Sequence, residues 1–112
     1  MGSWVYVRGW LDFYGQENEA RRMLADVPGW AFPEGGWARA ACYGRAVRAG
    51  HLDELLDRVR AVAALPAVDA DGDRVCGFFI AFHEEDGQFE WQVRDGEVFV
   101  SRAPARFDYL WR

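Results

Sequence analysis

The segment at residues 4–14 constrains the fold most, because both of its alternating faces carry large apolar side chains. Read as a strand, it places Val5, Val7, Leu11 and Phe13 on one face. It places Trp4, Tyr6, Arg8 and Trp10 on the other face. A strand with one face in water needs only one apolar face. We therefore expect either a strand that is covered on both faces or an aromatic surface that is kept for a partner.

The rest of the chain indicates strands alternating with two helices in a single compact domain, residues 1–112. Apolar alternation and aromatic runs predict further strands at residues 37–47, 75–83, 88–94 and 97–102. Helical periodicity predicts helices at residues 16–27 and 52–65, each followed by a proline. The order β-α-β-α-β-β-β indicates an α+β fold, with a mostly antiparallel sheet and two helices packed on one face.

The second predicted strand repeats the aromatic–arginine pattern of the first. Trp37, Arg39 and Tyr43 alternate on one face, and the other face carries only small residues, against which we expect a helix to pack closely. If both strands present the same face, these three residues join those of the first strand in one platform of hot-spot residue types. Two interpretations stay open: the platform binds a partner, or the aromatic tail at residues 107–111 or the loop at residues 30–32 covers it as a second hydrophobic layer.

Charge narrows the class of partner. The chain has thirteen arginines, no lysine and eighteen acidic residues, which give a net charge of −5. This balance opposes general nucleic-acid binding, which needs a basic footprint. It suits a basic protein partner, and it also suits solubility alone. The acidic positions that could supply complementary charge are Asp69, Asp71, Asp73, Glu84, Glu85 and Asp86.

Two acidic clusters resemble metal sites only in part. The Asp-x-Asp-Gly-Asp pattern that begins at Asp69 has Arg74 where a calcium loop of the EF-hand type needs glycine and Ile80 where it needs glutamate. His83 precedes three acidic residues, and His51 is the other histidine of the chain. We therefore expect a solvated turn and a charged hairpin loop, with no metal and no cofactor.

Catalysis finds little support in the sequence. Cys42 and Cys76 lie in apolar segments, and we expect buried free thiols in a reducing cytoplasm. Cys76 and His83 lie seven residues apart on one predicted strand, which places them on opposite faces. Cys42 could meet His83 only if their strands were neighbours in a favourable register. The chain lacks a glycine-rich phosphate loop, and no apolar run is long enough to span a membrane. A cytoplasmic protein that is more a binder than an enzyme is the expectation.

Four hypotheses follow for the function. The first is a small acidic protein-binding domain, for example of the inhibitor or immunity type, that neutralises a basic partner through the aromatic–arginine face and the acidic loops. The second is a small-molecule binding or sensing domain, as a homodimer in one version, with an aromatic pocket between sheet and helices. The remaining two are an enzyme that uses carboxylate or arginine chemistry and a homo-oligomeric structural unit.

Overall fold

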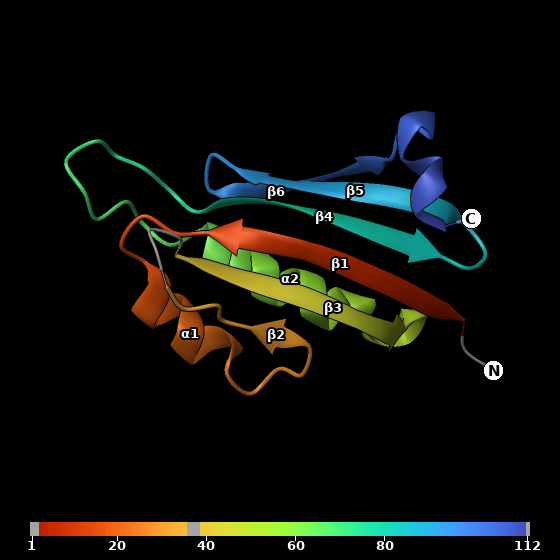
Figure 1. Cartoon of the computed structure of the whole chain (residues 1–112), viewed down its shortest axis with the longest axis horizontal. Helices are drawn as coiled ribbons and strands as arrows, with labels where there is room; N and C mark the ends of the chain where they lie inside the picture. Colours follow the sequence, from red (N-terminus) through yellow and green to blue (C-terminus); the bar gives the residue numbers. More distant parts are fainter. Residues whose placement is uncertain (1–2, 36–38, 112) are drawn as a thin grey trace.

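The computed structural model describes residues 3–35 and 39–111, which form an antiparallel six-stranded sheet with helices (Figure 1). The strands are β1 (Trp4–Asp12), β2 (Trp30–Ala31), β3 (Ala40–Arg48), β4 (Cys76–His83), β5 (Gly87–Arg94) and β6 (Glu97–Arg102). The helices are α1 (Glu17–Leu24) and α2 (Leu52–Ala63), and the 3₁₀ segments are η1 (Ala49–His51) and η2 (Ala105–Trp111). The α+β class and the antiparallel sheet are therefore confirmed.

The element order differs from the predicted one in the region before β3. Trp30 and Ala31 form the short strand β2, which pairs with Tyr43 and Cys42, where the sequence indicated a loop. The ring of Trp30 packs against Tyr43, with 4.9 Å between the ring centroids, and against Phe79 at 6.0 Å. This aromatic packing holds two residues in extended pairing that are too few to show a periodic pattern.

The spatial order of the strands, β2-β3-β1-β4-β5-β6, places the N-terminal strand inside the sheet. Val5 pairs with Val47 of β3 and with His83 of β4, and the register continues without a break to Asp12. β1 is therefore hydrogen-bonded along both edges and is an inner strand of the sheet.

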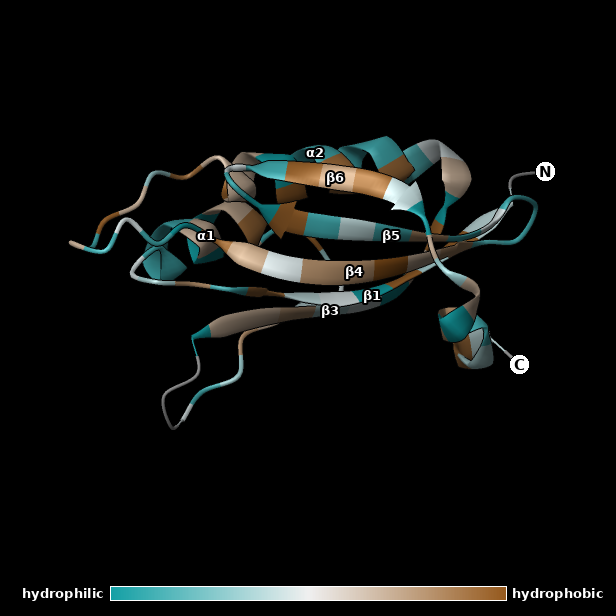
Figure 2. Cartoon of the chain, turned by 90° about the horizontal axis from the view of Figure 1, so that it is seen from above, coloured by the Kyte–Doolittle hydropathy of each residue, from teal (hydrophilic) through white to brown (hydrophobic). Residues whose placement is uncertain are grey.

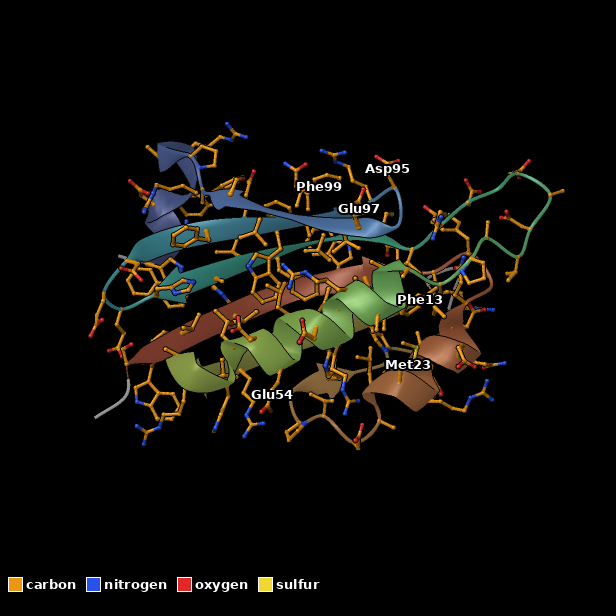
Figure 3. The ribbon with its side chains drawn as sticks, turned by 180° about the vertical axis from the view of Figure 1, so that it is seen from behind. Phe13, Met23, Glu54, Asp95, Glu97 and Phe99 are labelled. Atoms are coloured by element: carbon orange, nitrogen blue, oxygen red, sulfur yellow. The ribbon has the colours of Figure 1, made fainter. Side chains whose placement is uncertain are left out.

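One face of the sheet forms the core together with the helices. Val5, Val7 and Leu11 of β1 are fully buried, as are Phe79 of β4 and the Trp91 side chain of β5 to within 1%. α2 lies along this face, which Figure 3 shows from behind. Its apolar residues recur with helical periodicity, so they form one stripe that is buried against the sheet. The residues of α1 and α2 that are buried in the same core cluster are Ala20, Leu24, Leu55, Leu56, Val59, Val62 and Ala63.

The opposite face of the sheet is covered only at one end, by the tail. Figure 2 shows α2 on one side of the curved sheet and η2, which precedes the C-terminus, on the other. Within residues 3–35 and 39–111, none of the helices has the length and apolar character that membrane crossing requires.

Candidate functional site

The side chains of β1 that point away from α2 form a row, which we call the aromatic–arginine strip: Trp4, Tyr6, Arg8 and Trp10. Strand alternation sets this row opposite Val5, Val7 and Leu11, as the sequence predicts. Trp10 is 44% exposed, while Trp4 and Tyr6 are each 36% exposed. The guanidinium of Arg48 stacks over Trp4 at 4.5 Å from the ring centroid.

The middle of the strip lies under the C-terminal tail. The ring of Trp111 stacks on Phe82 with 4.6 Å between centroids and contacts Tyr6 at 5.3 Å. The Arg8 guanidinium lies 4.5 Å from the same indole, and Gln88 donates a hydrogen bond to the carbonyl of Phe107 at 3.0 Å. The tail therefore docks, and of the alternatives raised by the sequence, partial cover by the tail is the one seen.

The Trp10 end of the strip is open. Its indole contacts Phe78 of β4 at 6.1 Å and donates a hydrogen bond to Asp12 at 3.1 Å, so the exposed ring is held in place. On its other side Trp10 pairs with Cys42 of β3, where the same face carries only small side chains. We call this row the small-residue shelf: Ala40, Cys42, Gly44 and Ala46.

The small-residue shelf corrects two expectations. A helix was expected to pack on it, but η2 covers the strip from the β4–β5 side and α2 lies on the opposite face. Cys42 was expected to be buried, yet it is exposed, and Cys76 is half-buried with its Sγ 3.9 Å from the Tyr14 hydroxyl. Both thiols are free, because β1 separates their strands.

The platform predicted from two strands is not assembled as expected. Tyr43 pairs with Gly9 and lies on the α2 face, where it is 5% exposed, so it does not share a surface with Trp10. Arg39 precedes β3, and its Nε lies 3.9 Å from a carboxylate oxygen of Glu17. Trp37 lies outside the described residues. The four residues of β1 are the part of the platform that the structure brings together.

The six acidic positions fall at the two ends of β1. At the Trp4 end, Glu84 accepts a 2.6 Å hydrogen bond from the backbone N–H of Trp4. Its carboxylate therefore has a structural contact, and Glu85 and Asp86 lie beside it in the same exposed turn. At the Asp12 end lies the loop that leads into β4, and there the carboxylates of Asp69, Asp71 and Asp73 come within 4.8 Å of one another.

The aspartate loop has the features of a turn. Asp69 accepts a 2.9 Å hydrogen bond from the backbone N–H of Asp73, and Gly72 adopts a φ of +75°. Burial, followed by the charges of Asp69 and Asp71, raises the pKa of the Asp73 carboxyl. The Asp69 carboxylate therefore stabilises the backbone of its own loop, as in an Asx turn.

A thiol–imidazole pair is absent from the positions that the sequence offered. Cys42 lies on the face of the strip, whereas His83 pairs with Val5 and lies on the α2 face beside Phe89, at 4.8 Å between ring centroids. Burial lowers the pKa of the His83 imidazole, while the charge of Asp86 acts in the opposite direction. His83 is therefore an aromatic neighbour of the core.

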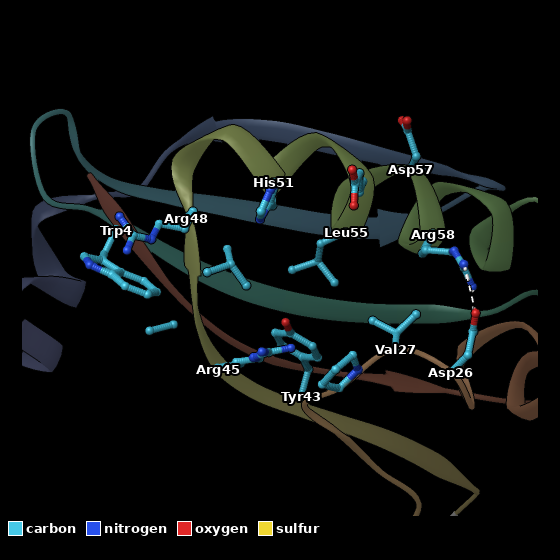
Figure 4. A pocket seen from close by; sticks show the side chains of 14 residues that line it. Trp4, Asp26, Val27, Tyr43, Arg45, Arg48, His51, Leu55, Asp57 and Arg58 are labelled. Carbon is cyan, nitrogen blue, oxygen red and sulfur yellow. Dashed lines mark hydrogen bonds and ion pairs between the residues drawn. The ribbon is translucent and has the colours of Figure 1, made fainter. Parts of the chain in front are cut away.

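The structure has a cleft of about 670 Å³ between α2, β3 and the loop that follows α1 (Figure 4). The second hypothesis from the sequence raised a pocket between sheet and helices but did not name its lining. We call it the α2–β3 cleft; its lining includes Trp4, Tyr43, Val47 and Leu55. Its charged lining residues are Asp26, Arg45, Arg48, His51, Glu54, Asp57 and Arg58. It forms because β2 pairs only with Tyr43 and Cys42, which leaves the rest of the β3 edge open.

An ion pair closes one end of the cleft. Arg58 of α2 donates to both carboxylate oxygens of Asp26, at 3.0 and 3.3 Å, and to the backbone carbonyl of Met23 at 2.6 Å. Hydrogen bonding to Arg58 lowers the pKa of the Asp26 carboxyl. These contacts tie the end of α1 to α2 and set the width of the cleft.

Comparisons of the chain with protein-family models, curated proteins and solved structures found no match. The fold and the two sites define an α+β domain with an open aromatic surface on one face and a lined cleft at the edge of the other.

Proposed function

We propose that the chain is a small protein-binding domain of the inhibitor or immunity type, which uses the open end of the aromatic–arginine strip and the neighbouring acidic loop to bind a basic partner. The observation that carries the proposal is Trp10, a tryptophan that is 44% exposed on an inner strand of the sheet. Tryptophan is enriched among the residues that dominate binding energy.

The setting of Trp10 resembles that of a preorganised contact residue. Its ring is held by Phe78 on one side and by the hydrogen bond to Asp12, so little side-chain entropy is left to lose on binding. The small-residue shelf beside it leaves space for a partner's side chain or backbone at the level of the indole. Exposed apolar surface next to a rigid aromatic side chain is typical of interaction sites.

Charge favours a basic partner. The net charge is −5, and Asp12, Asp69 and Asp71 lie toward the Trp10 end of β1. Acidic groups around an apolar centre speed the encounter with a positively charged surface and make the association sensitive to salt. The same charge disfavours pairing of two copies through this region, because like charges would meet.

The proposal predicts that Trp10→Ala abolishes capture of a partner from the cell of origin. The test uses affinity capture with the intact chain, identification of the bound protein, and repetition across a salt series. Tyr109→Ala is the matched control, because Tyr109 is an aromatic residue of the tail that is 69% exposed. We expect the wild type and the control to retain one basic protein, with binding that weakens steeply as salt rises.

Two results would contradict the proposal. One is equal capture by wild type and Trp10→Ala. The other is a wild-type dimer in light scattering that Trp10→Ala converts to a monomer, since the partner of the strip would then be a second copy of the chain.

A further inference from the structure

The α2–β3 cleft is lined by a tyrosine hydroxyl that no side chain of the described residues engages. Tyr43 is only 5% exposed, and its hydroxyl makes no hydrogen bond within residues 3–35 and 39–111. In Figure 4 the side chain of Tyr43 points from β3 into the cleft, between Arg45 and Leu55. A tyrosine hydroxyl that reaches a cleft from a mostly buried ring is held in place and can hydrogen-bond a ligand there.

The state of this hydroxyl favours donation. Burial raises the pKa of the Tyr43 hydroxyl, and the charge of Arg45 opposes that shift. The group is therefore protonated at neutral pH and offers its proton to an acceptor in the cleft. Arg45, two residues along β3, lines the same cleft beside Tyr43 (Figure 4).

Two guanidiniums on the β3 side of the cleft have no carboxylate partner among the described residues. Arg45 takes part in none of the ion pairs there, and Arg48 stacks on Trp4 without one. Arg58 differs, because Asp26 already neutralises it. An arginine that stacks on an indole keeps its donors free for a planar oxyanion.

Acidic groups stand on the α2 side. Asp57 lies 3.5 Å from Arg60, its partner on the next turn. Glu54 also lines the cleft and makes no ion pair among the described residues. The charge of the cleft is therefore divided: a positive β3 wall and a negative position on α2.

Between the charged walls lies an apolar surface made by Val47 and Leu55. The volume of about 670 Å³ falls in the size range of small-molecule sites, which combine an apolar lining with a few polar groups that fix orientation. An acceptor for Tyr43, a negative charge for Arg45 and Arg48, and a flat apolar body together describe one class of ligand.

We propose that the α2–β3 cleft binds a small aromatic carboxylate. Its carboxylate accepts the Tyr43 hydroxyl proton in a hydrogen bond and pairs with the Arg45 and Arg48 guanidiniums, and its ring packs on Val47 and Leu55. This site lies apart from the open end of the strip, because Trp10 lies on the other face of the sheet and does not line the cleft. Trp4, at the opposite end of the strip, does line it.

The experiment titrates 2-naphthoate into the intact chain by isothermal calorimetry, with 2-naphthamide as a neutral ligand of nearly the same shape. We expect the carboxylate to bind and the amide to bind at least tenfold more weakly, because the amide loses the charge-assisted hydrogen bonds. Equal affinity of the two compounds, or no binding of 2-naphthoate at millimolar concentration, would overturn the proposal.

Substitutions in the cleft locate the site, because they are expected to change the affinity for 2-naphthoate in opposite directions. Tyr43→Phe and Arg45→Gln should each weaken 2-naphthoate binding by about tenfold, whereas Glu54→Gln should strengthen it by removing a like charge. Arg45 is exposed, so its variant tests the site even if Tyr43→Phe disturbs the fold. Arg106→Gln, a change in η2, is the control and should leave affinity unchanged. A weakening by Arg106→Gln as large as that by Arg45→Gln would show a general charge effect and reject the site.

Discussion

Gly9 of β1 lies on the core face of the sheet and has no side chain. It pairs with Tyr43 on one side and with Phe79 on the other, in a sheet whose core face is filled by aromatic rings. A Cβ at Gly9 would collide with the carbonyl oxygen of Phe78 and with the ring of Phe79. The missing side chain therefore makes room for the aromatic cluster of Trp30, Tyr43, Phe79 and Trp91.

Gly9→Ala should lower the free energy of unfolding by about 1–3 kcal/mol, because added volume in a filled core forces rings and backbone to shift. Gly44→Ala is the matched control on the neighbouring strand, since a Cβ there meets no atom within 4 Å, and it should change stability by less than about 0.5 kcal/mol. Urea unfolding followed by tryptophan fluorescence measures both. Equal effects of the two substitutions would contradict the packing described for Gly9.

His83 should make the stability of the chain depend on pH. Its folded-state pKa is lowered by burial below the ordinary value of about 6.5, so protonation favours the unfolded chain. The stabilisation is complete above that ordinary pKa and is lost as the pH falls through the lowered one. Between pH 7.5 and 5.5 we expect thermal unfolding of the wild type to shift downward more than that of His83→Gln. His51→Gln is the control, and a wild-type slope retained by His83→Gln would refute the interpretation.

At the scale of the elements, η2 acts as a cover that one residue fastens. Trp111 stacks on Phe82, contacts Tyr6 and receives the Arg8 guanidinium, while Phe107 contacts Phe78 with 6.0 Å between ring centroids. The side chain of Tyr109 in the same segment points outward. A short 3₁₀ segment has little stability of its own, so these aromatic contacts hold it.

Trp111→Ala should cost about 2–3 kcal/mol of stability, from lost apolar burial and lost ring contacts. It should also raise the exposure of Tyr6 and Phe82, which binding of a hydrophobic dye would report. Tyr109→Ala, the exposed neighbour, should stay within about 0.5 kcal/mol of wild type in the same denaturation series. A Trp111→Ala variant as stable as Tyr109→Ala would mean that the tail does not fasten the sheet.

The elements with a long periodic pattern could be predicted from the sequence. α2 was expected at residues 52–65 and runs from Leu52 to Ala63, and the last strand, expected at residues 97–102, is Glu97–Arg102. Twelve helical residues with an unbroken apolar stripe leave little choice of orientation. β2 could not be predicted in this way, because two residues carry no period.

β3 shows why the face of a strand was harder to predict than the strand itself. Alternation shows that Tyr43 and Cys42 lie on opposite faces, but it does not show which of these faces meets the helices. The decision comes from across the strand pair, where Gly9 leaves space on the α2 face and Tyr43 occupies it. The strip on β1 was therefore foreseen residue by residue, whereas a pocket between sheet and helices was raised without the residues that line the α2–β3 cleft.

At the scale of the whole molecule, the two candidate sites lie on different faces of one sheet and differ in their chemistry. The open end of the strip offers an exposed indole near acidic loops, and the cleft offers arginines and a tyrosine hydroxyl. A substitution at Trp10 should leave the cleft intact, because Trp10 does not line it and residues without shared contacts usually act independently. The two proposals can therefore fail or stand separately.

The central position of β1 also bears on how the chain is made. The ribosome completes β1 before its first neighbour β3, and the second edge of β1 has to wait for β4, whose His83 pairs with Val5. Until then a nascent chain carries an open edge with apolar side chains on both faces, the kind of edge that pairs with other chains. A pause or premature stop in translation before β4 would therefore yield an aggregation-prone fragment. The open edge of β1 is closed only when β4 becomes available to pair with it.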